Sequence, residues 1–567
     1  LSTMETFSPL RLTDLGGKAM VEVPFKVLGW CTERKVIWYQ HRQTGQIANI
    51  TPSAQATPLL KLAPQKYWKD NFPQENEKTA GGNANEKAVG GIAWTKAASK
   101  IIEDANREGV FSLDRLRGCG VWMDGSRVVW HLGNRLEVNG RPVGLIDIQS
   151  SYHYQRLQKL NVDASVAQLS DEHGQGILKA VGAMGWASPL DHLHLLGWIM
   201  LANVGGAIEK RPVLQITCGY GKGKTYTLSF VVSPLLAGLA ISQSNCTEAS
   251  IRQTLGTNTL PVLIDESEGE DQNKREGHLR LARLSYDGVA TSRGTTHGKA
   301  LTYAVRSSIA LVGINATVPN PADRSRFVVV GRQPLPQAKW EKVDRQLQEL
   351  ITIETGVQLL RRTVTHLATL RANVATFRRV VEAQLPDGAA ARAGDTYGAL
   401  LAGAHLLSST KLLDEAQALN WLDEMKWNAA DALGLDASPE QSAAAEGEQC
   451  LAKLLSHQEN WKADSKGTGR LTVRELVGLA RSPGSSQEAV AARLVIGRLG
   501  IKATEKGLVI ANSPEALAPI YGNTKWRNKG HIERLRDLPN AKAAGLEHFP
   551  ALGSHKATEL PWVGVDF

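Results

Sequence analysis

The stretch VLQITCGYGKGKTYTLSF, residues Val213–Phe230, begins as an apolar strand, passes through a glycine-rich loop and continues as a helix. Glycines in such a loop allow backbone N–H groups to turn inward around phosphates, and the helix N-terminus adds a partial positive charge. Lys224 is placed to reach the β- and γ-phosphates of a nucleotide, and the Thr225 hydroxyl is placed to hold Mg²⁺. The segment therefore predicts a site for ATP and Mg²⁺ on an α/β fold.

The loop departs from the usual phosphate-loop spacing at one position. The pattern GxxxxGK[ST] would place its first glycine at Cys218, whereas Gly219 and Gly221 lie inside the loop and Gly223 precedes the lysine. We expect Gly219 or Gly221 to supply the flexibility that the missing glycine would give. A bare GK[ST] arises often by chance, but the order strand, loop, helix favours a nucleotide site.

A second apolar strand carries the acidic half of the predicted site. Leu260–Glu266, LPVLIDE, ends in two carboxylates. Asp265 would complete the magnesium shell through water, and Glu266 would polarise the attacking water as general base. The alternative, a strand that simply ends at a charged surface, is weak because this strand follows the loop so soon.

Two further features indicate a motor rather than a simple nucleotide binder. Ser307–Asn315 is another buried strand, and Asn315 at its end could orient the water or sense the γ-phosphate. Arg324 and Arg326 follow shortly after it, and arginines in this place often reach into a neighbouring subunit's site as a finger. Such a finger implies a ring of identical subunits. The alternative is a surface arginine paired with Asp323.

The segment between the acidic strand and Asn315 is longer than a minimal phosphate-loop fold needs. Arg275–Asp287 is expected to be a helix, and Ala290–Arg306 is expected to be a β-hairpin with a GTTHGK turn. His297 and Lys299 at the hairpin tip, assisted by Arg293, suit contact with a phosphate backbone. An ordinary exposed turn is the alternative.

The N-terminal third reads as a mixed α+β region without a catalytic constellation. Met20–Asn49 alternates apolar and polar residues as in a β-meander, Ala97–Arg107 is expected to be helical, and Arg117–Asn139 returns to strands. Glu77–Lys87 is polar and rich in glycine and asparagine, so we expect a surface loop. Six tryptophans are expected to pack in the core: Trp30, Trp38, Trp68, Trp94, Trp122 and Trp130.

The rest of the chain alternates helices with the strands already named. Asp191–Glu209 is expected to be an apolar helix, Lys342–Gln384 is long and helical, and Thr396–Leu433 adds further helices. Ala437–Gly447 is the best linker. The expected domains are a mixed α+β N-terminal domain (1–180), an ATPase core (181–345), a helical lid (346–436), a linker (437–460) and a C-terminal domain (461–567).

Helix, helix and hairpin follow one another in the C-terminal domain, which is the order of a winged helix. The helices are expected at Leu471–Ala480 and Gln487–Leu499, and the hairpin at Ile501–Asn512. Such a unit binds DNA or acts as a protein platform. The candidate DNA contacts are Arg493, Arg498, Lys502 and Lys506.

Composition agrees with a DNA-binding protein without requiring one. The chain of 567 residues has a net charge of +9, which favours a polyanionic partner. We expect a cytoplasmic protein with no membrane association, because no apolar run is long enough to span a bilayer and the start does not read as a secretory signal. The five scattered cysteines fit free thiols and argue against structural zinc: Cys31, Cys119, Cys218, Cys246 and Cys450.

With these residues identified, the chain resembles a family of replicative helicases from prophages, plasmids and other mobile genetic elements. These look like AAA+ ATPases near the MCM-like and viral superfamily 3 helicases. The resemblance runs most of the length, and it implies an AAA+ core, ATP-driven unwinding by a hexameric ring, single-stranded or forked DNA as partner, and a primase or initiator partner. It is carried by the nucleotide motifs and by Val23–Trp30, Leu62–Trp68, Leu116–Leu136, Arg392–Leu407 and Thr524–Ala541.

Two rival functions remain open at this point. An initiator would use ATP as an assembly switch at an origin and bind duplex DNA through the winged helix. A phosphate-loop kinase or metabolic ATPase would be a monomer indifferent to DNA. The arginine that senses nucleotide from the lid is unassigned, because Arg361, Arg362 and Arg371 all lie on the expected lid helices.

Overall fold

The computed structural model divides the chain into two compact units, which are described separately. The first comprises residues 1–316 and 325–421, and the second comprises residues 317–324 and 422–567. The residues that the structure describes are 23–31, 35–74, 91–218, 223–265, 272–288, 290–294, 300–313, 325–385, 390–433, 447–448, 450–462, 468–482, 486–522, 524, 526, 529–538 and 540–562.

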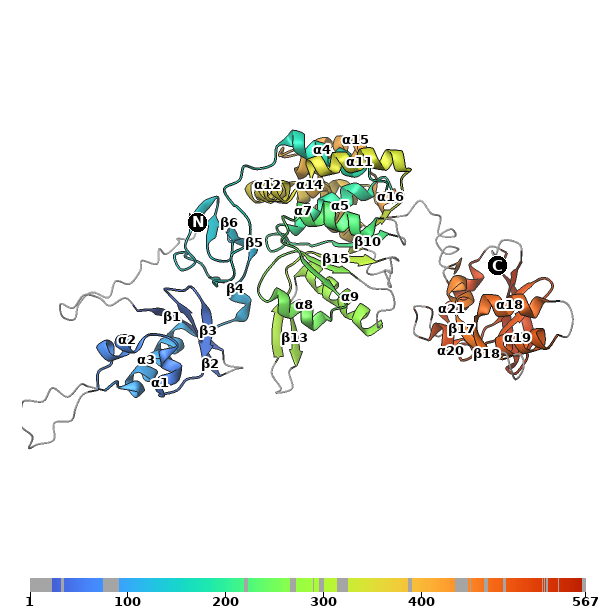
Figure 1. Ribbon diagram of the computed structural model, residues 1–567, viewed down its shortest axis with the longest axis horizontal. Helices are drawn as coiled ribbons and strands as arrows, with labels where there is room; N and C mark the ends of the chain where they lie inside the picture. Colours follow the sequence, from blue (N-terminus) through green and yellow to red (C-terminus); the bar gives the residue numbers. More distant parts are fainter. Residues whose placement is uncertain are drawn as a thin grey trace, which may run out of the picture. The chain divides into compact units, whose positions relative to one another are not determined.

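A five-stranded parallel sheet forms the centre of the first unit (Figure 1). Its strands lie in the order β11-β12-β15-β10-β16, and all four pairings are parallel. In the sheet, β15 therefore lies between β10, which leads into the glycine-rich loop, and β12, which carries the acidic residues. The expected α/β class is confirmed. The strands are β10 (Val213–Cys218), β11 (Ile241–Ser244), β12 (Val262–Asp265), β15 (Ile309–Gly313) and β16 (Phe327–Arg332).

Helices cover this sheet, and the apolar helix before β10 is shorter than expected. It is α5 (Asp191–Ala202), which ends well before Glu209. Gly205 and Gly206 follow, and a side chain on either would collide with main-chain carbonyl oxygens of Arg306 or Val121. The chain therefore leaves the helix to pass close to two other segments. The remaining helices around the sheet are α6 (Lys224–Tyr226), the π-helical η2 (Thr227–Val232), α7 (Ser233–Leu235), α8 (Glu248–Leu255) and α9 (Gln272–Asp287).

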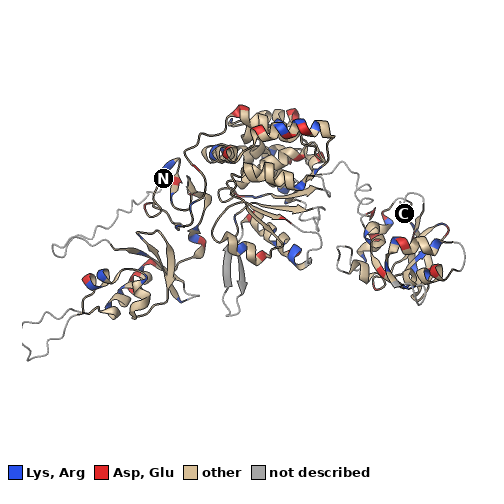
Figure 2. Ribbon diagram, in the orientation of Figure 1, with Lys and Arg blue, Asp and Glu red and all other residues tan. Residues whose placement is uncertain are grey.

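The stretch Lys342–Gln384 is helical as expected, and it is divided among three helices. Thr352 begins the second of them with a capping box to Thr355, and His366 separates the second from the third. Residues of both charge signs follow one another along the first, as expected for a solvated helix face (Figure 2). The helices of this region are α11 (Gln337–Leu350), α12 (Ile353–Thr365), α13 (Leu367–Ala383), α14 (Ala390–Ser408) and α15 (Glu415–Glu424).

The N-terminal region has the mixed α+β content that the sequence predicts. The Asn139-Gly140 turn is confirmed, since both residues have positive φ (47° and 79°). Of the six tryptophans, Trp38, Trp68, Trp122 and Trp130 are buried, and the other two are partly exposed. The elements are β1 (Phe25–Cys31), β2 (Val36–His41), β3 (Ile47–Ile50), α1 (Ala56–Leu60), α2 (Gln65–Asn71), α3 (Trp94–Glu108), η1 (Leu113–Arg115), β4 (Leu116–Arg117), β5 (Gly120–Asp124), β6 (Arg127–His131), β7 (Leu136–Val138), β8 (Arg141–Val143), β9 (His153–Tyr154) and α4 (Asp171–Gly182).

In the second unit the helix–helix–hairpin order is confirmed, but the hairpin belongs to a larger sheet. Two strands near the C-terminus, which the sequence analysis did not predict, extend it to the order β19-β20-β22-β21. The elements are α16 (Ala429–Leu433), β17 (Gln458–Lys462), β18 (Thr468–Thr472), α18 (Val473–Arg481), α19 (Gln487–Arg498), β19 (Ile501–Ala503), β20 (Gly507–Ala511), α20 (Ala518–Tyr521), α21 (Gly530–Arg536), β21 (Lys542–Phe549) and β22 (Gly553–Pro561).

None of the helices in the described part of the chain combines the length and apolar character needed to cross a membrane. All five cysteines are buried and free of disulfide bonds. Two sequence predictions, the surface loop at Glu77–Lys87 and the linker at Ala437–Gly447 except for Gly447 itself, lie outside the described residues.

Two glycines let α5 and α14 pack backbone to backbone beside the sheet. A β-carbon on Gly197 would lie 2.0 Å from the Leu400 carbonyl oxygen, and one on Gly403 would lie 2.5 Å from the Gly197 carbonyl oxygen. Any side chain at either position would force the helices apart. Since α5 leads into β10 and α14 packs against α13, this contact joins the sheet to the helices that follow it.

Gly197→Ala is expected to lower the stability of the first unit by about 3 kcal/mol, because overpacked helix contacts force backbone shifts. The midpoint of thermal unfolding measured by circular dichroism checks this. Gly176→Ala in α4 is the matched control, since its β-carbon would meet only Leu350 methyl carbons at 3.4 and 3.6 Å. The explanation is wrong if both variants unfold at the same temperature as the parent.

Candidate functional site

The loop lysine and the first carboxylate of the acidic strand meet at the carboxyl edge of the sheet. Lys224 Nζ lies 2.8 Å from Asp265 Oδ1. Gly223 directly before Lys224 has φ +90°, a conformation that favours glycine, and it caps the helical run that begins with α6. Parallel strands end at a common edge, so β10 and β12 bring these side chains together although β15 lies between them.

A buried arginine next to the loop was not foreseen from the sequence. Arg332 ends β16, pairs with Cys218 across the sheet and is only 6% exposed. A β-carbon on Gly223 would lie 3.6 Å from an Arg332 guanidinium nitrogen, so this cation lies beside the predicted phosphate loop. Its Nε has no hydrogen-bond partner in the described part of the chain. Burial lowers the pKa of Arg332, and its charge is therefore held beside the loop in a poorly solvated place.

Carbonyl groups and two indole rings fix the Arg332 guanidinium. It donates to the carbonyl oxygens of Met184 and Gly185, the latter at 2.6 Å. Its central carbon lies 5.3 Å from the centroid of the Trp186 ring and 5.6 Å from that of Trp340. Segments well before β10 and well after the sheet therefore converge on the loop.

Tyr226, directly after the Gly-Lys-Thr triplet, connects the loop helix to α11. Its hydroxyl donates to the Asp344 carboxylate, and its ring meets that of Trp340 edge to face at 4.8 Å. Burial and, to a lesser extent, Asp344 raise the pKa of Tyr226, which keeps the phenol protonated. A displacement of α6, which contains Tyr226, would therefore displace α11 as well.

Asp191 at the start of α5 secures the strand that carries Arg332. One carboxylate oxygen accepts hydrogen bonds from the backbone N–H of Gly331 at 2.9 Å and of Ser188 at 3.1 Å. Only 4% of Asp191 is exposed, and burial raises its pKa to about 6. The folded carboxyl therefore binds a proton more tightly than the unfolded one, whose ordinary pKa is 3.8.

This raised pKa makes the stability of the first unit fall as the pH rises from about 4 to about 6, because the folded state binds more protons in this window. In Asp191→Asn, an amide oxygen can accept both hydrogen bonds without a charge. We expect the variant to lose the pH dependence and to gain up to about 3 kcal/mol at neutral pH, at about 1.4 kcal/mol for each pH unit between the two pKa values.

Thermal unfolding followed between pH 4 and pH 8 checks this expectation. Asp191→Ala serves as the control, since it removes the charge together with both hydrogen bonds and is expected to be less stable than the parent at every pH. Equal pH profiles for the parent and Asp191→Asn would contradict the assignment.

The candidate finger residue Arg326 lies at the opposite edge of the sheet from Lys224. It directly precedes β16, whose first residue pairs with Val213 at the start of β10, and the Val213 N–H donates to the Arg326 carbonyl oxygen. The six-residue strand β10 separates the two edges by about 17 Å at about 3.3 Å per residue. Arg326 therefore lies too far away to reach the lysine end of its own chain's loop.

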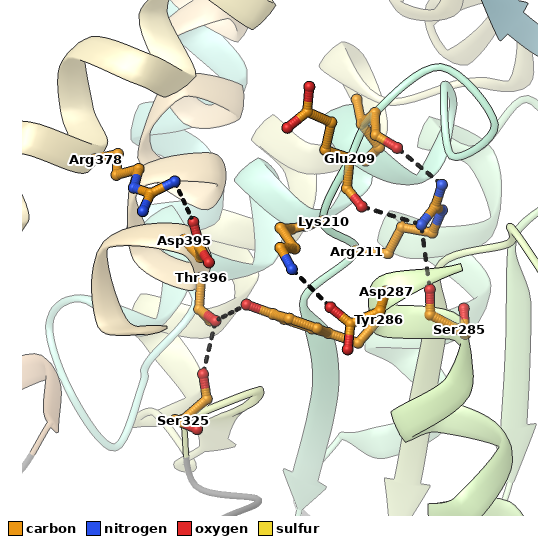
Figure 3. A network of polar contacts seen from close by, with 11 residues as sticks. Glu209, Lys210, Arg211, Ser285, Tyr286, Asp287, Ser325, Arg378, Asp395 and Thr396 are labelled. Atoms are coloured by element: carbon orange, nitrogen blue, oxygen red, sulfur yellow. Dashed lines mark hydrogen bonds and ion pairs between the residues drawn. The ribbon is translucent and has the colours of Figure 1, made fainter. Parts of the chain in front are cut away.

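A polar network holds the segment around Arg326 (Figure 3). The Tyr286 hydroxyl of α9 lies 2.9 Å from the Thr396 hydroxyl of α14, which in turn donates to the Ser325 carbonyl oxygen at 2.7 Å. The Arg326 guanidinium carbon lies 5.7 Å from the centroid of the Tyr286 ring. Lys210 and Asp287 form an ion pair of 2.7 Å beside the same ring.

The hairpin predicted between β12 and β15 is confirmed, and its two ends are held by one arginine. It consists of β13 (Ala290–Gly294) and β14 (Ala300–Ala304), paired antiparallel. Arg211, only 4% exposed, donates to the Ser285 carbonyl oxygen before the hairpin and to that of Arg306 after it, at 3.3 and 3.2 Å. Burial lowers the pKa of Arg211 to about 10, so it stays charged at neutral pH.

The three lid arginines have structural contacts. Arg362 is 1% exposed and donates to the carbonyl oxygens of Leu169 and Leu406 at 2.7 Å each, and to Asp171. Arg361 pairs with Glu137, and Arg371 lies 3.6 Å from Glu209. These contacts give Arg362 a structural role in packing, which explains why it is buried.

The predicted DNA contacts of the second unit fall into two groups. Arg493 donates to the carbonyl oxygens of Ala480 and Ser482 at the end of α18, and Lys502 forms an ion pair of 2.9 Å with Glu547. Arg498 and Lys506 are exposed. All four stay predictions.

Several predicted site residues lie outside the described part of the chain. This holds for the loop glycines, the general base, the sensor, one finger candidate and the hairpin tip: Gly219, Gly221, Glu266, Asn315, Arg324, His297 and Lys299. Arg293 lies in β13, but its side chain is not described. Thr225 is exposed in the first turn after the loop.

No family model matches this sequence, and no curated protein matches it. Among solved structures, one described as "SCCmec type IV Cch - active helicase" aligns with a TM-score of 0.45 at 12% identity, covering 97% of this chain and 98% of that one. An apo structure of the NrS-1 C-terminal region aligns with a TM-score of 0.30 at 10% identity over 95% and 97% of the two chains. A JCV helicase bound to a small molecule aligns at 0.21 and 17% identity over 36% and 56%. All three TM-scores lie below 0.5, so these chains do not establish a shared fold.

Proposed function

We propose that the chain is an ATP-dependent DNA helicase or translocase that acts as a hexameric ring in the replication of a phage or mobile element. The observation that carries this proposal is the Lys224–Asp265 contact of 2.8 Å at the carboxyl edge of the parallel sheet. A lysine from a glycine-rich loop and a carboxylate from a neighbouring strand are what a nucleoside triphosphate and its Mg²⁺ require.

The residues present fit ATP and Mg²⁺. Lys224 would bind the β- and γ-phosphates, while Thr225 and Asp265 would hold the metal ion, which neutralises charge on the phosphates. The Lys224–Asp265 ion pair keeps both groups together until phosphate and metal take over their partners. Arg332, with an unsatisfied Nε beside Gly223, adds a second cation next to the loop. Glu266 would orient and deprotonate the attacking water.

A ring is favoured by the place of Arg326. An arginine at the amino edge of the sheet is remote from its own chain's lysine, yet Tyr286, Thr396 and the Ser325 backbone hold its segment in a defined position. Such an arginine would complete the site of the adjacent subunit. An arginine shared in this way would distinguish a ring motor from a monomeric kinase or metabolic ATPase.

Contact with DNA is assigned to the hairpin between β12 and β15. His297 and Lys299 lie in its turn by sequence, and β15, which follows the hairpin, ends at the same edge of the sheet as Asp265. Arg211 connects both ends of the hairpin to the segment that leads into β10. Rearrangement of the sheet edge on hydrolysis would therefore move the hairpin as one piece.

Steady-state ATP hydrolysis with and without single-stranded DNA tests the motor. We expect DNA to stimulate the parent several-fold, and His297→Ala/Lys299→Ala to hydrolyse ATP without responding to DNA. Lys224→Ala is the control and should lower the rate by about 100-fold or more, because it removes charge stabilisation at the phosphates. If DNA leaves the parent rate unchanged, the translocase proposal is wrong, and an initiator that uses ATP as an assembly switch or a metabolic ATPase takes its place.

Mixing two inactive variants tests the shared site. Lys224→Ala and Arg326→Ala should each be inactive, but an equal mixture should recover about one quarter of the parent activity, since random assembly pairs an intact loop with an intact arginine at about one site in four. A mixture of Lys224→Ala with the double variant is the control and should recover nothing. Full activity of Arg326→Ala alone would exclude this arginine as the finger.

A further inference from the structure

The N-terminal region contains a basic pocket that lies outside the nucleotide site. Its walls come from β1 and β2 and from the segment that leads into β9. Lys26 and Arg42 line it and are exposed, and none of its lining residues is acidic. In the described part of the chain, no carboxylate forms an ion pair with either of these two cations.

Positive charge is concentrated at this pocket. His153, which also lines it, has its pKa lowered to about 4, first by burial and then by the charges of Lys26 and Arg115. Arg115, exposed in η1, likewise has no ion pair within the described residues. Like charges held together without carboxylates repel one another, so an anionic ligand would relieve this repulsion.

The pocket also offers surfaces that a phosphate alone would not use. Tyr152 is half-buried, since it packs against the core cluster around Leu145 and Tyr154 and the Arg117 guanidinium carbon lies 4.1 Å from its ring centroid. Its remaining exposed part lines the pocket. Ile146 is 42% exposed at the same pocket.

From these contacts we infer that the pocket binds a single-stranded nucleic acid, with Lys26 and Arg42 on the phosphates and Tyr152 and Ile146 against a base. Aromatic stacking combined with cations along the backbone is the general way in which proteins hold single strands. A duplex keeps its bases stacked inside and would use the cations alone. The inference does not depend on the nucleotide chemistry proposed above.

Photo-crosslinking of the full-length protein without ATP tests this site. The probe is a thymidine oligonucleotide of about 12 nucleotides with 5-iododeoxyuridine, which crosslinks to aromatic side chains. We expect a crosslink in the tryptic peptide 136–156, which contains Ile146 and Tyr152. Lys26→Gln/Arg42→Gln should lower its yield about ten-fold through the loss of two phosphate contacts.

Two further variants test whether the loss of crosslinking is specific to the pocket. Lys66→Gln/Lys69→Gln on α2 removes the same charge from an exposed helix elsewhere in the region and should leave the yield unchanged. Ile146→Glu places a negative charge at an exposed position of the pocket and should lower the yield as strongly as the double variant. DNA-free ATP hydrolysis should stay at the parent level in all of them.

The outcomes separate this inference from the proposed function. Crosslinks confined to other peptides, or an undiminished yield in both pocket variants, would overturn the inference and leave the motor intact. An equal yield from a duplex that contains the same strand would also overturn it. A crosslink at 136–156 in a protein that hydrolyses no ATP would support this site while contradicting the motor.

Discussion

The rest of the structure depends on the parallel pairing of β10 with a neighbour on each side. β15 and β16 both run parallel to it, so Cys218 at the end of β10, the end of β15 and Arg332 all lie at one edge. The segment that precedes β16 and contains Arg326 lies at the opposite edge of the sheet, where β10 begins. Because backbone hydrogen bonds fix this register, the separation of Lys224 from Arg326 follows from topology and not from side-chain choices.

Local patterns predicted much of this arrangement. Apolar runs of four to six residues followed by polar or glycine-rich segments predicted β10, β12 and β15, because buried parallel strands need apolar residues on both faces. The hairpin was predicted from the extra length between the acidic strand and Asn315 and from its glycine-containing GTTHGK turn. Of the candidate site, Lys224 and Asp265 were assigned to one nucleotide site from the sequence, but the direct ion pair between them was not predicted.

Contacts between distant segments could not be predicted in this way. Arg332 was not singled out in the sequence, and only its place between Met184, Trp186 and Trp340 shows its relation to the loop. Asp191 looked like the start of a helix, whereas its carboxylate accepts a hydrogen bond from Gly331. The helical character of Lys342–Gln384 was predicted, but the breaks at Thr352 and His366 were not.

Three of the buried arginines join segments of the first unit that lie far apart in the sequence. Arg211, Arg332 and Arg362 donate to main-chain carbonyl oxygens from segments far apart in sequence. Breaking any of these clusters would leave a buried cation and several carbonyl oxygens without hydrogen-bond partners, which costs about 1–3 kcal/mol for each unsatisfied group. The Lys224–Asp265 pair is different, because its side chains are 28% and 41% exposed and water can replace either partner. A ligand at the loop therefore meets little resistance at this pair. When a ligand binds at the loop, the segments held by these arginines are expected to move as rigid pieces. A displacement at the loop is therefore expected to displace α11 and the hairpin.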